Sequence, residues 1–205
     1  EPERIEQDLG GVAELWKGDG TDAGTVLVKD IAPVGSSNPS ELTMANGTLY
    51  FSANADIYTQ GTELWKSDGT AGGTVLVKDI RPGAIGSNPA FLTNVNGILI
   101  FSADEGTNGN ELWRSNGVAA DTVLLKNINP SGSSSPRSIT AVGAMAYFVA
   151  NDGSHGDEPW KTTGTTAGTV LVDDINPGAG GSSPEFLTSA SGVALFFRAA
   201  NSSVG

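Results

Sequence analysis

The sequence predicts an all-β protein, a four-bladed β-propeller with four antiparallel strands per blade and one blade split between the N- and C-terminal ends. Three observations predict it. A Glu-Leu-Trp motif, or its variant Glu158-Pro159-Trp160, recurs every 47–49 residues and contains all four tryptophans. A Thr-Val-Leu segment follows each motif in phase. Glycine and proline interrupt the chain too often for helices, and β-branched and aromatic residues fill the intervals.

We denote the four strands of a repeat A to D. Strand A is expected at 41–45, 91–95, 138–142 and 186–190, and strand B at 48–53, 98–103, 145–150 and 193–199. Strand C contains the tryptophan, and strand D is the Thr-Val-Leu segment. Asn46-Gly47 and Asn96-Gly97 supply the positive φ angles of a two-residue hairpin turn between A and B.

Strand B is apolar on both of its faces. Leu49 and Phe51 point one way and Tyr50 the other, and the second and fourth repeats show the same pattern. A strand buried on both faces needs a packed layer on each side. Four sheets that pack face to face around an axis would provide those layers.

The two ends of the chain are in phase with each other. The first repeat enters at Glu14, in strand C, and the last leaves after strand B, near Asn201. We therefore expect the first C–D pair and the last A–B pair to form one split blade that closes the ring. Residues 11–205 would be a single propeller, and residues 1–10 a polar N-terminal tail or edge segment.

Composition excludes several classes of function. The net charge of −12 disfavours nucleic acid and anionic lipid as partners, and no apolar run is long enough to span a membrane as a helix. There is no cysteine, and His155 is the one histidine. Ser154 and Asp152 adjoin His155, but adjacency within one loop does not make a catalytic triad. We therefore expect a protein that is not an enzyme.

The phrases Glu63–Thr70 and Gly73–Ile80 closely resemble the bacterial ELWxxDGT-repeat proteins, and the resemblance covers about residues 11–205. It implies a secreted or cell-surface protein. The Asp-Gly-Thr part is intact at Asp19 and Asp68, whereas Asn116 and Thr163 replace the aspartate in the later repeats. The predicted architecture is also similar to hemopexin-type four-bladed propellers, and the repeat length to tachylectin-type lectins.

The predicted loops fall into two sets. The A–B and C–D loops are short and share one face, and the longer polar B–C and D–A loops share the other. Variable loops on a rigid scaffold usually hold the binding site, so we expect ligand binding on the B–C and D–A face. The candidate ligand-binding residues are Asn38, Asn88, Ser135, Ser183, Asn54 and Asp56.

Oxygen-bearing side chains crowd the B–C loops. The candidate metal ligands are Asp104, Glu105, Asn108, Asp152 and Asp157. Ca²⁺ takes six to eight oxygen ligands, so Ca²⁺ is the cofactor that these loops favour. The alternative is that these residues form Asx-turns, in which the side chain binds its own backbone. Carbonyl oxygens of the innermost strands are a second possible ion site.

The tryptophans have two interpretations. A Trp face stacks well on a sugar ring, but a mid-strand Trp beside a Leu is more typical of a core between blades. We favour the core.

These observations predict a secreted binding module, with no enzymatic activity, that recognises a glycan or another cell-surface ligand through the B–C and D–A face, with calcium as a possible aid. Two alternatives stand beside it. One is a calcium-rigidified spacer within a larger surface protein. The other is a hydrolase that uses carboxylates such as Asp104, Glu105 and Asp152.

Overall fold

The computed structural model describes residues 12–55 and 59–202. In them the chain is all-β, with antiparallel strand pairs and one short 3₁₀ turn, η1 (Ala119–Asp121). The all-β prediction is therefore confirmed. The predicted tail at residues 1–10 lies outside the described residues.

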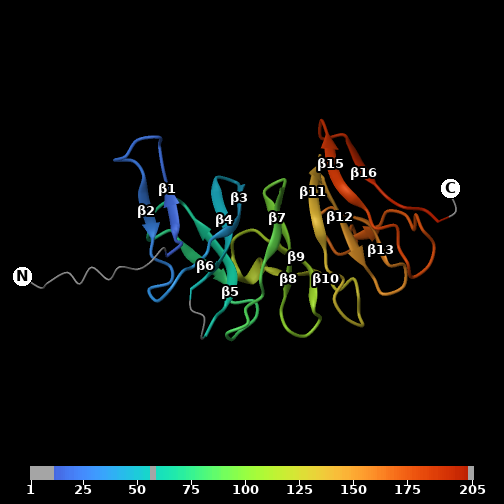
Figure 1. The fold of residues 1–205 in the computed structure, drawn as a ribbon, viewed down its shortest axis with the longest axis horizontal. Coiled ribbons are helices and arrows are strands. Elements are labelled where there is room, and N and C mark those ends of the chain that lie inside the picture. Colours follow the sequence, from blue (N-terminus) through green and yellow to red (C-terminus); the bar gives the residue numbers. More distant parts are fainter. Residues whose placement is uncertain (1–11, 56–58, 203–205) are drawn as a thin grey trace, which may run out of the picture.

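Three four-stranded sheets form the middle of the chain, and each has the strand order A-B-C-D (Figure 1). The first sheet contains β3 (Ser40–Ala45), β4 (Thr48–Asn54), β5 (Thr62–Ser67) and β6 (Val75–Lys78). The second contains β7 (Ala90–Val95), β8 (Ile98–Asp104), β9 (Asn110–Ser115) and β10 (Val123–Lys126). The third contains β11 (Arg137–Val142), β12 (Met145–Asn151), β13 (Asp157–Thr162) and β14 (Val170–Leu171). In these sheets the A and B strands begin and end within one residue of the predicted positions.

We refer to each four-stranded sheet as a blade and to each two-stranded sheet as a half-blade. The two ends of the chain form half-blades that remain apart. β1 (Leu15–Lys17) and β2 (Val26–Lys29) make one two-stranded sheet, and β15 (Glu185–Ala190) and β16 (Ala194–Arg198) make another. Figure 1 places these two sheets at opposite ends of an open arc. The predicted split blade is therefore not formed in this structure. The direction in which each blade packs on the next sets the curvature of the arc, and the repeat pattern alone does not fix that direction.

The last A–B turn is one residue longer than the others. Ala190 pairs with Ala194, whereas Ala45 pairs with Thr48 in the first complete sheet. The N–H of Val193 donates to the carbonyl of Ala190 at 3.0 Å and closes this longer turn. As a result, strand B of the last repeat starts one residue later than predicted.

The A strands lie side by side along the inner rim of the arc. The first three each carry a threonine whose hydroxyl donates to a main-chain carbonyl of the next A strand. Thr43 donates to Leu92 and Thr93 to Ile139, each at 2.9 Å. These bonds fix neighbouring blades relative to each other without using the side chain of the acceptor residue.

Cationic side chains make a second set of links between blades. Lys66 in β5 donates to the carbonyl oxygen of Gly117 at 2.8 Å, and Lys17 and Arg114 make the corresponding bonds in the neighbouring repeats. Lys78 in β6 donates to the carbonyl oxygen of Thr122 at 2.8 Å. All of these acceptors are backbone atoms of the following repeat.

The hydrophobic core lies between blades, as the two-faced apolar pattern of strand B predicts. Leu99, Ile100 and Phe101 in β8 have no exposed surface. Leu99 and Phe101 pack against the preceding blade, and Ile100 packs against the following one.

Three tryptophans belong to this core and one does not. Trp65, Trp113 and Trp160 are only 5–7% exposed, and each packs against apolar side chains of the preceding blade. The core interpretation is confirmed for these three. Trp16 is 57% exposed, so that interpretation is wrong for Trp16. The part of the chain that the structure describes holds no blade before β1 and β2.

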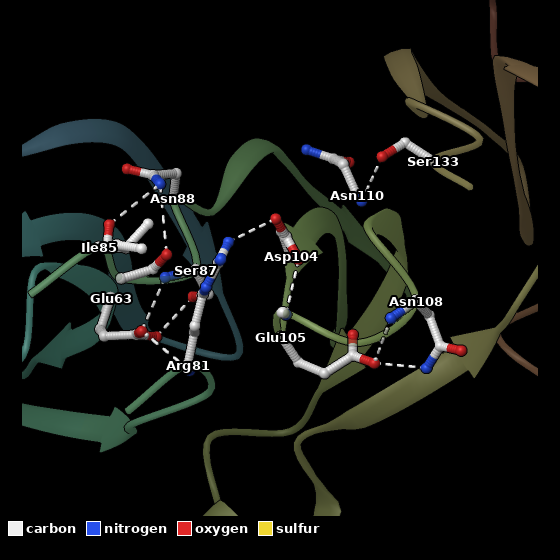
Figure 2. Close-up of polar contacts among 12 residues, drawn as sticks. Glu63, Arg81, Ile85, Ser87, Asn88, Asp104, Glu105, Asn108, Asn110 and Ser133 are labelled. Carbon is white, nitrogen blue, oxygen red and sulfur yellow. Dashed lines mark hydrogen bonds and ion pairs between the residues drawn. The ribbon is translucent and has the colours of Figure 1, made fainter. Parts of the chain in front are cut away.

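The glutamate of each tryptophan motif holds the loop that follows strand D. The Glu63 carboxylate has no exposed surface, and it accepts a hydrogen bond from the Ser87 hydroxyl at 2.5 Å (Figure 2). It also accepts the N–H of Ile80 at 3.0 Å. Glu111 makes the same bonds one repeat later. Burial raises the pKa of Glu63 and of Glu111, and the hydrogen bonds offset part of that increase.

Two substitutions test the assignment of the tryptophans. Trp65→Ala should lower the free energy of unfolding by about 3–5 kcal/mol, because it removes a large aromatic from a packed interface. Trp16→Ala is the matched control, with the same motif and an exposed side chain, and it should change stability by less than about 1 kcal/mol. Urea denaturation of dilute protein, in which each chain is monomeric, followed by fluorescence measures both. Equal losses in the two variants would contradict the assignment.

Glu111→Gln tests the buried carboxylate. The glutamine amide brings N–H groups to a site already filled by N–H and O–H donors, so donors are left without acceptors. The expected loss in the free energy of unfolding is about 1–3 kcal/mol. Asp22→Asn, at an exposed position in the C–D loop, is the control and should have little effect. If Glu111→Gln unfolded at the same urea concentration as the parent, the carboxylate would not be needed to hold the loop.

Candidate ligand-binding face

Each D–A loop lies between two neighbouring blades. The N–H of Asn88 donates to Thr62 at the start of β5, and the N–H of Asp104 at the end of β8 donates to Ser87, at 3.0 Å in both cases. Gly86 also forms a parallel bridge with Thr62. The D–A and B–C loops therefore meet at one end of the blades, as predicted.

Four of the predicted ligand-binding residues have a structural role. Asn38, Asn88, Ser135 and Ser183 all precede a proline and have φ between 45° and 49°. Their N–H groups donate to carbonyls at or near the start of strand C, at 3.0–3.1 Å. The positive φ thus turns the chain from the loop into strand A while the backbone stays bonded.

The other two predicted ligand-binding residues are Asn54 and Asp56. The side-chain oxygen of Asn54, at the end of β4, is buried and accepts no hydrogen bond from the described residues. Asp56 lies outside the described residues.

Three of the predicted metal ligands, Asp104, Glu105 and Asn108, contact groups on the same face of the blades. Asp104 forms an ion pair with Arg81 at 2.6 Å, and its other oxygen accepts the N–H of Gly106 at 2.6 Å (Figure 2). Glu105 accepts hydrogen bonds from the backbone and the side chain of Asn108 through a single oxygen, Oε1. The bonds from the N–H groups of Gly106 and Asn108 are those of the Asx-turn interpretation and its glutamate counterpart.

The remaining predicted ligands, Asp152 and Asp157, also have cationic or potentially cationic partners. Asp157 pairs with Arg137 at 2.9 Å, and Asp152 contacts the imidazole of His155 at 2.7 Å. Across residues 12–55 and 59–202, no three Asp, Glu or His side chains gather into a metal-binding group. In this structure Asp104, Asp152 and Asp157 thus each have a cationic or potentially cationic partner.

Three buried oxygens beside the second complete sheet lack donors among the described residues. They are Oε2 of Glu105, Oδ1 of Asn110 and Oδ1 of Asn127. Asn127 also donates to the side-chain oxygen of Asn108 at 2.8 Å, so the end of strand D contacts the B–C loop here. Hard cations prefer carboxylate and amide oxygens, so this part of the face fits Ca²⁺ in its chemistry.

His155 and Asp152 shift each other's titration. The hydrogen bond to Asp152 and the charge of Asp152 raise the pKa of His155. Burial opposes ionisation of Asp152, but hydrogen bonds from the backbone and ring of His155 outweigh it and lower the pKa of Asp152.

The two shifts make stability depend on pH. The contribution of His155 to stability is present below its unfolded pKa of about 6.5 and is lost as pH rises through its raised folded pKa. The contribution of Asp152 is present above its unfolded pKa of about 3.9 and is lost as pH falls through its lowered folded pKa.

Asp152→Asn tests this pair. The substitution removes the negative charge, so the pKa of His155 should fall toward its ordinary value. NMR titration of the His155 ring protons measures it without ambiguity, because the chain has no other histidine. Asp121→Asn, in the C–D loop at the other end of the blades, is the charge-matched control and should leave the His155 titration in place. An unchanged titration in Asp152→Asn would show that the contact does not form in solution.

A cleft of about 660 Å³ opens where strands β7, β11 and β15 begin. Phe91, Arg137, Ser138, Glu185 and Phe186 line it, with neighbouring residues of β11 and β15. Phe186 is 73% exposed and Phe91 is 41% exposed. Exposed aromatic rings beside charged side chains make this cleft the strongest candidate binding site on the described part of the face.

The cleft residues occupy an irregular position in each A strand. Pairing with strand B shifts register after the first residue of strand A in all four repeats, as in a β-bulge. The residue at the shift has φ between 53° and 59°; it is Glu41, Phe91, Ser138 or Phe186. Bulges redirect side chains, and three of these residues, Phe91, Ser138 and Phe186, line the cleft.

The sequence analysis did not identify this cleft. Variation at one position of an otherwise regular repeat could have indicated it. The prolines that end the D–A loops recur in every repeat, whereas the second residue after each changes from Glu41 to Phe91, Ser138 and Phe186.

The Asp-Gly-Thr motif lies at the other end of the blades, in the C–D loop. The Asp68 carboxylate accepts the N–H and the hydroxyl of Thr70, at 2.9 and 2.7 Å. A Cβ on Gly73 would come within about 2 Å of that carboxylate, so a larger residue there would displace the carboxylate from the turn. In the later repeats Asn116 and Thr163 make related turns through their own side chains. The motif thus builds a turn and takes no part in the cleft.

Comparisons of the chain with known protein families, curated proteins and solved structures found no match. Within the described ranges, no helix is long and apolar enough to cross a membrane.

Proposed function

We propose that this chain is a secreted, non-enzymatic binding module built of propeller-type blades, and that it recognises a glycan through the cleft at the start of β7, β11 and β15. The exposed aromatic side chains of Phe91 and Phe186 in that cleft are the observation that carries the proposal. A cleft of about 660 Å³ is large enough for a ligand of several sugar-sized groups.

The chemistry of the cleft suits a sugar. A flat ring such as Phe186 offers an apolar face to the C–H side of a pyranose. Glu185 and Arg137 offer an acceptor and donors to hydroxyl groups. Arg198 lies 5.5 Å from the centre of the Phe186 ring and pairs with Glu185, and these contacts orient both residues.

The arrangement favours binding over hydrolysis. Glycoside hydrolysis usually needs two carboxyl groups on opposite sides of the scissile bond. Among the residues lining the cleft, Glu185 alone carries a carboxyl group. Asp104, Glu105 and Asp152 are engaged by partners in or beside their own loops.

A glycan array followed by calorimetry with the best oligosaccharide tests the proposal. Phe186→Ala should weaken binding by at least about tenfold, a difference of about 1.4 kcal/mol. Val193→Ala, which changes an 85% exposed apolar residue in the A–B turn, is the control and should bind like the parent. The proposal fails if the parent binds no glycan, or if Phe186→Ala binds as tightly as the parent.

A second candidate is a spacer stiffened by calcium, favoured by the unpartnered buried oxygens of Glu105, Asn110 and Asn127. Ca²⁺ that binds only the folded state would stabilise it by about 2.7 kcal/mol at a hundredfold excess over Kd. Millimolar Ca²⁺ should then raise the melting temperature more than Mg²⁺ does, since Mg²⁺ sheds its water reluctantly.

Glu105→Gln should remove most of the Ca²⁺ response, while Asp22→Asn should keep it. If melting curves of the parent are the same in Ca²⁺ and EDTA, the spacer candidate is to be abandoned. Glycan binding that persists in EDTA would leave the proposed binding function standing without the metal.

A further inference from the structure

The two ends of the arc carry the two complementary halves of one blade. Strands β1 and β2 have the C and D positions of a repeat, and β15 and β16 have the A and B positions. In the three complete sheets, strand B pairs with strand C along its length. Within the described ranges, β16 pairs only with β15 and β1 only with β2, so each has one open edge. An open strand edge presents unpaired N–H and carbonyl groups to another strand.

Apolar side chains that are buried between blades elsewhere are exposed at both ends. Trp16 is 57% exposed, against 5–7% for the other three tryptophans. At the far end, Val172 is 43% exposed, whereas Val77 and Leu125, at the same position of earlier repeats, are 6% and 3% exposed. The faces that carry Trp16 and Val172 are thus the two sides of an interface that the chain already forms between its own blades.

We propose that these ends bind each other between two copies of the chain, with β16 of one copy paired to β1 of the next. The shared sheet would be a complete four-stranded blade. Trp16 of the second copy would pack against the third complete sheet of the first copy, near Val172, as Trp160 packs against the sheet before it.

The complete blades give the register of this pairing. The residue of strand B that lies opposite the tryptophan is Phe51, Phe101 or Phe148, and its neighbour lies opposite the cation after the tryptophan. The bond from the Ala200 N–H to Ser182 matches that from Asn151 to Ser134, which aligns Phe197 with Phe148. Phe197 therefore lies opposite Trp16, and Phe196 opposite Lys17.

The geometry of one chain favours contact between two copies over contact between the two ends of the same copy. Figure 1 shows β1–β2 and β15–β16 separated by the full length of the arc. The threonine and cation bonds between blades resist the bending that would bring the ends together. The contact joins two different surfaces, so it generates a ring or a filament of copies and not a two-fold symmetric dimer.

Net charge gives the association a distinctive salt dependence. Each copy carries a charge of −12, so copies repel each other at low ionic strength. The proposed contact is itself apolar and backbone-mediated. Added salt screens the repulsion, and association should therefore strengthen from low to physiological ionic strength.

Cysteine cross-linking tests the register, and the chain has no natural cysteine to interfere. Lys17→Cys and Phe196→Cys proteins, mixed under oxidation, should form a disulfide-linked pair of chains. A mixture of Lys17→Cys and Leu42→Cys is the control and should form no disulfide-linked pair. Leu42 is exposed, as Phe196 is, but it lies on β3, away from the proposed contact. The double variant carrying Lys17→Cys and Phe196→Cys should form linked multimers. If it cross-links within a single chain instead, the ends close a ring in one copy and the proposal is overturned.

Light scattering during gel filtration tests the interface in solution. The parent should exceed the 20.9 kDa monomer mass as concentration rises. Trp16→Glu and Val172→Asp act on opposite sides of the contact, and each should weaken association by about tenfold or more. Val34→Asp, at a 79% exposed loop position, should associate like the parent. A parent that stays monomeric at high concentration and physiological salt overturns the proposal, as does equal association of all three variants.

Discussion

The other features of the repeat depend on one interaction, the hydrogen bonding of a buried glutamate in strand C to the D–A loop. A carboxylate without exposed surface is costly unless donors surround it, and here a serine hydroxyl and backbone N–H groups of one loop converge on it. The loop ends where strand A begins, so the glutamate also fixes where the next blade starts. Serine is needed for the same reason as glutamate, and Ser37, Ser87, Ser134 and Ser182 are all fully buried.

Features fixed by local sequence were predictable. Hairpin turns, the alternation within strands and the two-faced burial of strand B follow from residue types over a few positions, and the complete sheets match the expected strands closely. The Asx-turn alternative for the acidic loops also came from local chemistry, and the bonds of Asp104 and Asp152 are of that kind.

Features that depend on neighbours were not predictable. Trp16 and Trp65 follow the same Glu-Leu pair, yet one is exposed and the other buried, because only Trp65 has a blade before it. Whether the blades close into a ring was not predictable either. The angle between blades arises from side chains packing across sheets, and no short sequence pattern encodes an angle. The cleft was not predicted for a related reason. Phe91 and Phe186 have the sequence pattern of ordinary strand residues, and only the structure shows the bulge at their positions.

The cations that join one blade to the next all end on backbone carbonyls, and this has a consequence for how such chains evolve. A carbonyl oxygen is present whatever side chain its residue carries, so a mutation in one repeat does not remove the acceptor that its neighbour uses. A repeat copied by gene duplication would find its docking partners already in place on either side. Repeats can therefore be gained, lost or shuffled while the bulge residues of strand A diverge. New binding specificities can then arise without any change in the contacts between blades.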